Sequence, residues 1–208
     1  MSLQAEIRRI VAEAERRRIA VKLVGAWGVK HHSPRHARET FDVDVVALGK
    51  DEERLVSMFR ELGFRHSRFT RRRVDLVFFR KEPLRMKVDV NLDVIRSFER
   101  PELFLDVREE LTDFPGQSLS PESLFLSKLF GPIDEDVEYD LACLILDSSP
   151  SIDKLVGMLN ENLMLRREVD RKLPSLTGLT LKELRFRKGE KENVIRFIRS
   201  LRRRLKGL

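Results

Sequence analysis

The stretch Phe41-Asp42-Val43-Asp44-Val45-Val46 alternates apolar and acidic residues as far as Val45. Alternate side chains of a strand share one face, so the pattern predicts a strand with Phe41, Val43 and Val45 on one side. Asp42 and Asp44 then lie on the other side, about 7 Å apart. Two carboxylates this close repel each other unless a proton or a cation lies between them.

Residues 85–95 repeat this arrangement, with Val88 and Val90 on one face and Asp89, Asn91 and Asp93 on the other. If the two strands are neighbours, Asp89 completes a three-carboxylate site for Mg²⁺, which prefers hard oxygen ligands. Three acids can hold two metal ions, one activating an attacking oxygen and one stabilising a leaving phosphate. The alternative is a half-exposed strand whose solvent face carries aspartates.

The segment before these strands offers a place for an anion. The apolar run Ala20 to Val24 predicts a strand that ends at the small-residue turn Gly25-Ala26-Trp27-Gly28, followed by a short helix. Free backbone N–H groups at such a turn bind anions. The turn precedes Asp42 by at least fourteen residues, so a phosphate held there could reach metal ions at the carboxylates.

The rest of the chain divides near residue 98. Before it, periodicity predicts helices over 3–18 and 51–62, the second ending at Gly63, and strands over 64–70 and 74–79. After it, helices are predicted over 121–131, 134–147, 151–171, 179–187 and 190–206, with Pro132, Pro174 and Gly189 between them. The expected fold is α+β: a mixed β-sheet flanked by helices in residues 1–98, then a helical domain in 99–208 with a basic C-terminal helix.

Composition excludes several classes of protein. Of the 208 residues, 41% are hydrophobic, which is enough for a core and excludes a disordered chain. No apolar run approaches the roughly 18 residues of a membrane span. The single cysteine, Cys143, excludes an internal disulfide and a Cys-rich zinc site, favours a cytoplasmic protein, and is expected to be a small buried residue. Two Gln and four Asn among many charged residues are typical of a thermophile.

The net charge of +7 is unevenly distributed. Residues 185–208 carry ten Lys or Arg and two Glu, and residues 60–73 carry six Arg and one Glu, whereas residues 100–140 carry eleven acids and three bases. The two basic segments favour contact with RNA or another polyanion. The alternative is a set of solvated helices laced with salt bridges.

Residues 20–147 resemble the nucleotidyltransferase superfamily of polymerase-beta type, and within it the abortive-infection toxin branch. The resemblance is carried by Gly25-Ala26-x-Gly28, by Arg38-x-Thr40-x-Asp42-x-Asp44, and by Asp89 in a later strand. Two weaker elements follow in the helical half, Ser127-Lys128-Leu129 and Tyr139-Asp140-Leu141.

The resemblance implies a nucleoside triphosphate as donor of a nucleoside monophosphate. It implies Mg²⁺, two ions with Mn²⁺ as a substitute, held by the catalytic residues Asp42, Asp44 and Asp89. The nucleotide would be bound by the glycine turn, by the Arg38 and Thr40 segment, and by Lys128, with Asp140 supporting the same site. The acceptor is unidentified, with RNA as the candidate.

One departure from the family pattern concerns activity. The position after Gly25 usually carries Gly or Ser, whose hydroxyl binds phosphate, and here it is Ala26. A non-catalytic module that binds nucleic acid or a partner protein is therefore the alternative. A two-metal nuclease ranks last, because no lysine is evident beside the acids on their own strand.

Other residues have competing interpretations. His31, His32 and His36 favour a loop over the nucleotide, together with Arg35, more than a zinc site. Arg38 either contacts phosphate or pairs with an aspartate. Lys128 lies beside an apolar helix stripe and either reaches the triphosphate or extends to water. Trp27 is expected to pack in the protein.

Overall fold

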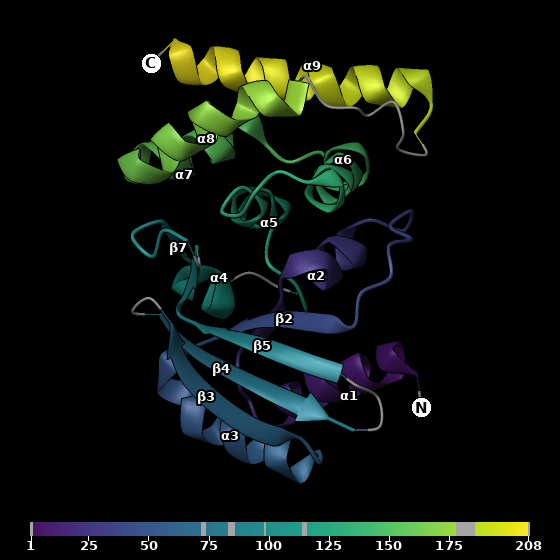
Figure 1. The fold of residues 1–208 in the computed structure, drawn as a ribbon, viewed down its shortest axis with the longest axis vertical. Coiled ribbons are helices and arrows are strands. Elements are labelled where there is room, and N and C mark those ends of the chain that lie inside the picture. Colours follow the sequence, from purple (N-terminus) through teal and green to yellow (C-terminus); the bar gives the residue numbers. More distant parts are fainter. Residues whose placement is uncertain are drawn as a thin grey trace.

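The computed structural model describes residues 2–71, 74–82, 86–97, 99–113, 116–177 and 186–207. A five-stranded mixed sheet with the order β1-β2-β5-β4-β3 forms its lower half (Figure 1). The strands are β1 (Val21–Leu23), β2 (Asp42–Ala47), β3 (Arg65–Arg71), β4 (Val74–Lys81) and β5 (Met86–Leu92). β2 and β5 are parallel and the other neighbours are antiparallel. The predicted mixed sheet is confirmed.

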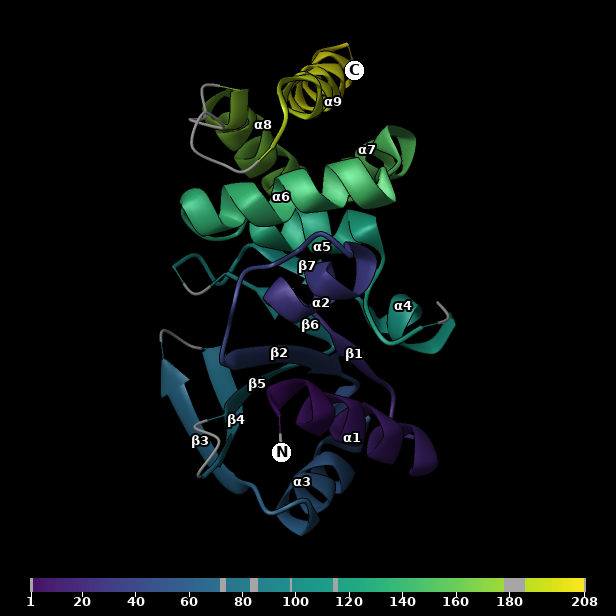
Figure 2. The same cartoon turned by 90° about the vertical axis from the view of Figure 1, so that its right-hand side faces the viewer.

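Helices cover both faces of this sheet. One face packs on α1 (Leu3–Arg16) and α3 (Glu52–Glu61), and α2 (Gly25–His32) lies over the other (Figures 1 and 2). Beyond α2 lie α5 (Pro121–Lys128), α6 (Glu135–Ser148), α7 (Ile152–Glu161), α8 (Leu163–Thr177) and α9 (Lys188–Lys206). α9 is the element farthest from the sheet (Figure 1). The α+β class with a C-terminal helical region is therefore confirmed.

Strand alternation separates two apolar cores. Val43 and Val45 of β2 and Val88 and Val90 of β5 pack with α1 and α3. Val46 faces the other way, into the core shared by α2 and the helical half. Each full burial of such a side chain contributes about 1.5–3 kcal/mol. Phe41 does not join its predicted face: β2 begins at Asp42, and the Phe41 side chain is 64% exposed.

The predicted strand over 85–95 is interrupted at Asp93. This residue has a φ of 61°, and its carboxylate accepts a hydrogen bond from the Gly49 N–H at 2.9 Å, in the 3₁₀ turn Gly49–Asp51. The chain turns out of the sheet there, and β6 (Val94–Arg96) pairs with β7 (Phe104–Asp106). β7 and the short helix α4 (Arg108–Asp113) were not predicted.

Three helix boundaries also differ from the predictions. The helix expected over 151–171 is two helices, α7 and α8, because Asn162 caps a new start by accepting the Leu165 N–H at 3.0 Å. Pro174 lies inside α8 instead of after it, and Gly189 lies inside α9. Most of the helix predicted over 179–187 falls outside the described residues. The division at residue 98, also outside them, stays a prediction.

No described helix combines the length and the apolar character that crossing a membrane requires.

Candidate active site

Asp44 and Asp89 face each other across the two parallel strands. The register of β2 and β5 pairs Asp44 with Asp89, and both lie on the face opposite Val43, Val45, Val88 and Val90. Burial raises the pKa of Asp44 to about 6, with the negative charge of Asp89 adding to the rise. A carboxylate whose ionised form is disfavoured by burial and by a neighbouring carboxylate is suited to bind a proton or a cation.

Asp42 lies at the exposed start of β2, where its register partner is Lys87. Its charge reaches Asp44 and contributes to the raised pKa of that residue. Within the described ranges, no three His, Cys, Asp or Glu side chains are grouped closely enough to hold a metal ion. The structure therefore brings together the pair Asp44 and Asp89, and the set of three with Asp42 stays a prediction.

The glycine turn lies directly against Asp44. Gly25 has a φ of 60°, and a Cβ built on it would overlap Oδ2 of Asp44 and lie 2.9 Å from its Cγ. A Cβ on Gly28 would lie 2.7 Å from Cδ2 of Leu124 on α5. Both glycines are thus required by close approach: Gly25 to the carboxylate and Gly28 to the helical half.

α2 begins at Gly25 itself, where the sequence predicted a four-residue turn before the helix. Its N-cap residue Val24 makes no side-chain cap, and the first intrahelical bond runs from the Gly28 N–H to the Val24 carbonyl at 2.9 Å. The N–H groups of the first turn, Gly25 to Trp27, lack intrahelical acceptors. Together with the helix dipole they present partial positive charge beside Asp44.

Lys128 ends α5 on the same side of the sheet. Its Nζ lies 2.5 Å from Oδ2 of Asp140, and its side chain is only 13% exposed. Its charge also lowers the pKa of Asp44, against the effect of burial. Lys128 therefore lies between two carboxylates, one structural and one at the candidate site, and does not extend to water.

Asp140 on α6 is a fully buried carboxylate that contacts two cations, Lys128 and Arg38, and the ring of His36. Nε2 of His36 lies 2.7 Å from its Oδ1, and Arg38 donates to its Oδ2 at 3.0 Å. Burial by itself would raise the pKa of Asp140, but the His36 hydrogen bond and the charges of Lys128 and Arg38 prevail and hold it at about 2. Asp140 is therefore ionised and fixes Lys128 in place.

The segment between α2 and β2, residues 33–40, is fastened to the helical half; we call it the strap. Ser33 donates to Asp147 of α6 at 2.5 Å, and Arg35 pairs with Asp147 at 2.6 Å and with Glu190 of α9 at 2.5 Å. The Ala37 N–H donates to the Tyr139 hydroxyl at 3.0 Å. The hydroxyl of Thr40 donates locally to the Asp42 carbonyl at 3.3 Å. Arg35 and Arg38 thus contact acids of the protein in this structure.

The histidines do not form a metal set. His36 is buried against Asp140, and Nε2 of His32 lies 2.8 Å from the Leu119 carbonyl. His31 packs edge-on against His32. Trp27 packs, as expected, at the edge of the core that the sheet forms with α1 and α3. Cys143 is fully buried.

Sequence reasoning missed Lys87, whose Nζ lies 2.6 Å from Oδ2 of Asp89. The two residues are two positions apart on one strand, so their shared face was readable from the alternation. Lys87 also corrects the argument that ranked a nuclease last, since it is a lysine beside the acids on their own strand.

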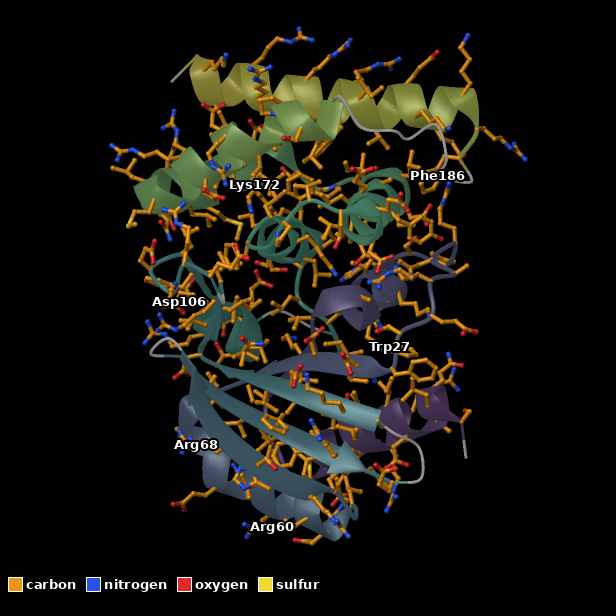
Figure 3. All side chains as sticks on the ribbon, in the orientation of Figure 1. Trp27, Arg60, Arg68, Asp106, Lys172 and Phe186 are labelled. Atoms are coloured by element: carbon orange, nitrogen blue, oxygen red, sulfur yellow. The ribbon has the colours of Figure 1, made fainter. Side chains whose placement is uncertain are left out.

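The second basic block, 60–73, runs from the end of α3 along β3, the far edge strand of the sheet. Arg60 and Arg68 lie at this lower end of the molecule (Figure 3), and residues 72 and 73 fall outside the described residues. The other block forms α9. Neither block adjoins the Asp44 and Asp89 pair.

Comparison with known proteins shows what the first half of the chain and its fold are similar to. The model of the aminoglycoside-2''-adenylyltransferase family matches residues 6–103. A crystal structure of ANT(2'')-Ia in complex with adenylyl-2''-tobramycin is 16% identical, with a TM-score of 0.51, and the match covers 74% of this chain and 92% of that one. A solution structure of the antibiotic-resistance factor ANT(2'')-Ia is 15% identical, with a TM-score of 0.43, over 98% and 95% of the two chains. No curated protein matches.

The matched family differs from the toxin branch that the sequence resembled, and that finer placement is not confirmed. The matched segment contains the glycine turn and all three aspartates on the expected mixed sheet, which supports the resemblance to the superfamily over that segment. The resemblance of this chain to the nucleotidyltransferase superfamily is thus confirmed for residues 6–103.

Proposed function

We propose that this protein transfers a nucleoside monophosphate from a nucleoside triphosphate to a hydroxyl acceptor, in a reaction that requires Mg²⁺. One observation carries the proposal: Asp44 and Asp89 face each other across β2 and β5, directly beside the start of α2. A carboxylate pair next to free backbone N–H groups is suited to a metal-bound phosphate chain.

The residues present fit a divalent cation. The pKa of Asp44 is raised to about 6 by burial and by Asp89, which is the condition that a bound cation relieves. Asp44 and Asp89 would hold the metal, with Asp42 as the third ligand, and Mn²⁺ would substitute for Mg²⁺ with the same oxygen ligands. The metal supplies charge neutralisation of the phosphate oxygens when bound.

The chain's own groups would bind and orient the donor. The first-turn N–H groups of α2 donate to phosphate, and Lys128 adds a positive charge whose position Asp140 fixes. Ala26 provides no hydroxyl, so the backbone N–H groups and Lys128 have to supply the phosphate contacts. Losing one such donor costs about 1–3 kcal/mol of binding, which is compatible with a weaker but functional nucleotide site.

In the transfer, an acceptor oxygen forms a bond to the α-phosphorus as the bond to pyrophosphate breaks. We assign the Asp89 carboxylate to take the acceptor proton, because it lies beside Asp44 on the site face and carries the hydrogen bond from Lys87. Lys87 would keep this carboxylate oriented. Pyrophosphate is the leaving group and takes the electron pair of the broken bond, and one negative charge stays on the transferred monophosphate.

The charges around the site favour a cationic acceptor. Asp42, Asp134, Glu135 and Asp136 are exposed, and Asp134 and Asp136 act on Arg38 beside the buried Asp140. Such a rim repels a polyanion. ANT(2'')-Ia has been solved with adenylyl-2''-tobramycin, an adenylylated product of this chemical kind. We therefore place a polyhydroxylated cationic compound first and RNA second as acceptor.

A second candidate function is a non-catalytic module for nucleic acid. Arg196, Arg199 and Arg203 are exposed on α9 at positions that share one helix face. This surface lies at the end of the molecule away from the sheet (Figure 1), so nucleic-acid binding there would not need the carboxylates.

Titration calorimetry with ATP, CTP, GTP and UTP, with and without Mg²⁺, tests the proposal. We expect metal-dependent binding of at least one triphosphate, loss of that binding in Asp44→Asn, and no change in Asp153→Asn, whose exposed carboxylate lies on α7. Pyrophosphate release is then assayed with a cationic aminocyclitol, with RNA and with no acceptor. Absence of metal-dependent nucleotide binding by the wild type would refute the enzyme. A salt-dependent gel shift that persists in Asp44→Asn would favour the module.

A further inference from the structure

A cleft separate from the carboxylate pair lies between α1 and α2. Its volume is about 280 Å³, and its floor consists of Ile7, Val11 and Leu23. The Trp27 side chain forms a wall, at the position where α2 approaches α1 (Figure 3). β1 lies between this cleft and β2, on the side of β2 away from β5. The cleft therefore shares only Trp27 with the candidate active site: its side chain faces the cleft, and its backbone N–H belongs to the first turn of α2.

The titratable residues that line the cleft are all basic: Arg8, Lys30 and His31. Arg8 is exposed and has no acidic partner among the residues that the structure describes. The pKa of His31 is lowered, first by burial and then by the positive charges of His32 and Lys22. No acidic residue acts on His31 to raise its pKa again. The cleft therefore carries the positive charges of Arg8 and Lys30, which an anion would neutralise, and His31 adds a ring that can donate a hydrogen bond.

Trp27 adds a flat apolar surface with an unused donor. Its Nε1 is buried and has no hydrogen-bond partner within the described residues. A buried indole N–H normally finds an acceptor. Nζ of Lys30 lies 4.6 Å from the ring centroid, which places positive charge next to the ring. An acceptor atom of a ligand would satisfy the indole and pair with the lysine at once.

We propose that this cleft binds a nucleoside monophosphate. The two cations Arg8 and Lys30 match the charge of one phosphate group, and the apolar floor with the Trp27 ring matches a planar base. The amides of Gln4 and Gln117, which also line the cleft, can donate to and accept from the edge of a base. Binding here needs neither a metal nor the carboxylate pair, so it stands apart from the proposed transfer reaction.

Trp27 is the only tryptophan of the chain, so its fluorescence reports on this cleft. The probe is adenosine monophosphate, titrated in EDTA so that no divalent cation is present, with adenosine and inorganic phosphate titrated separately. We expect a saturable fluorescence change with adenosine monophosphate, and binding at least about tenfold weaker for either fragment. Arg8→Gln should weaken binding about tenfold, the effect of one charge-assisted hydrogen bond, and His31→Gln should weaken it less, because an uncharged imidazole makes a weaker hydrogen bond.

Matched variants separate this site from the catalytic one. Arg9→Gln removes the neighbouring α1 arginine, which is not part of the cleft, and should leave the affinity unchanged. Asp44→Asn and Lys128→Met should also leave it unchanged. The proposal is overturned if no saturable change occurs, if inorganic phosphate binds as tightly as the nucleotide, or if Lys128→Met abolishes binding. Failure of the proposed transfer reaction would not alter these results.

Discussion

Replacing Gly25 by alanine tests the contact between the glycine turn and the carboxylate site. The new Cβ would overlap Oδ2 of Asp44 and lie 2.9 Å from its Cγ, on a residue whose φ is 60°. The left-handed backbone costs roughly 1–2 kcal/mol for a residue with a Cβ. The overlap costs about 1–3 kcal/mol more, less if the Asp44 side chain rotates away. The variant should therefore be about 2–5 kcal/mol less stable.

Two glycine controls separate these contributions. Gly116 also has a positive φ, 109°, but nothing lies within 4 Å of an added Cβ, so Gly116→Ala measures the backbone cost alone. Gly131→Ala has neither a positive φ nor a neighbour within 4 Å. Urea denaturation of all three variants gives the free energies of unfolding. We expect Gly25→Ala to be the most destabilised and Gly131→Ala the least.

The double variant Gly25→Ala/Asp44→Ala identifies the partner. Truncating Asp44 removes the overlapping oxygen and the Cγ, and leaves its Cβ at 3.1 Å. The double variant should thus be more stable than the sum of the two single changes predicts. Gly25→Ala should also lose metal-dependent nucleotide binding, because the carboxylate has moved. If Gly25→Ala costs no more than Gly116→Ala and shows no coupling to Asp44→Ala, the close approach is not what requires glycine at this position.

Three further predictions concern titratable groups. Because burial and Asp89 raise the pKa of Asp44 from 3.8 to about 6, the folded protein keeps this proton over a range in which the unfolded chain has lost it. Stability should therefore fall as pH rises from 4 to 6, by about 2–3 kcal/mol without metal, and Asp44→Asn should lack this fall in urea denaturation; equal pH profiles would contradict it. Asp140 has the opposite sign, since its pKa is lowered to about 2: its contribution is present above about pH 4 and lost as pH falls towards 2. Asp140→Asn should reduce the free energy of unfolding by about 3–5 kcal/mol, against at most about 1 kcal/mol for the exposed Asp136→Asn. If thermal unfolding shows similar losses for both variants, the ion pairs of the buried Asp140 do not stabilise the fold as proposed. Burial raises the pKa of Cys143 to about 11, so a disulfide reagent at pH 8 should label no thiol in the native protein and one per chain in guanidinium; rapid native labelling would show the thiol to be accessible.

Local patterns predicted the sheet and the carboxylate pair well. The alternation around Val43 and Val88 assigned the apolar faces correctly, and placed Asp44 and Asp89 on the opposite one. Gly63, predicted to end a helix, has a φ of 85° after α3. These features depend on residues a few positions apart, which is the range over which periodicity carries information.

Long-range contacts explain what the sequence did not predict. The alternation continues through Asp93 to Val94, yet the chain bends there, because the Asp93 carboxylate accepts a hydrogen bond from Gly49, 44 positions away. The grouping of His36, Arg38 and Lys128 around Asp140 likewise requires the strap to reach α6, about a hundred residues on. Neither the hydrogen bond of Asp93 nor the contacts around Asp140 leave a periodic signal in the sequence.

The strap has a mechanical consequence for the reaction. It leaves the end of α2 and enters β2 just before Asp42, while its polar groups hold α6 and, through Arg35, the first turn of α9. A tilt of the helical bundle would therefore pull on the strand that carries the acids. In the proposed reaction, opening of the bundle and release of product would then be coupled, and their rate would rise with ionic strength as the Arg35 pairs are screened.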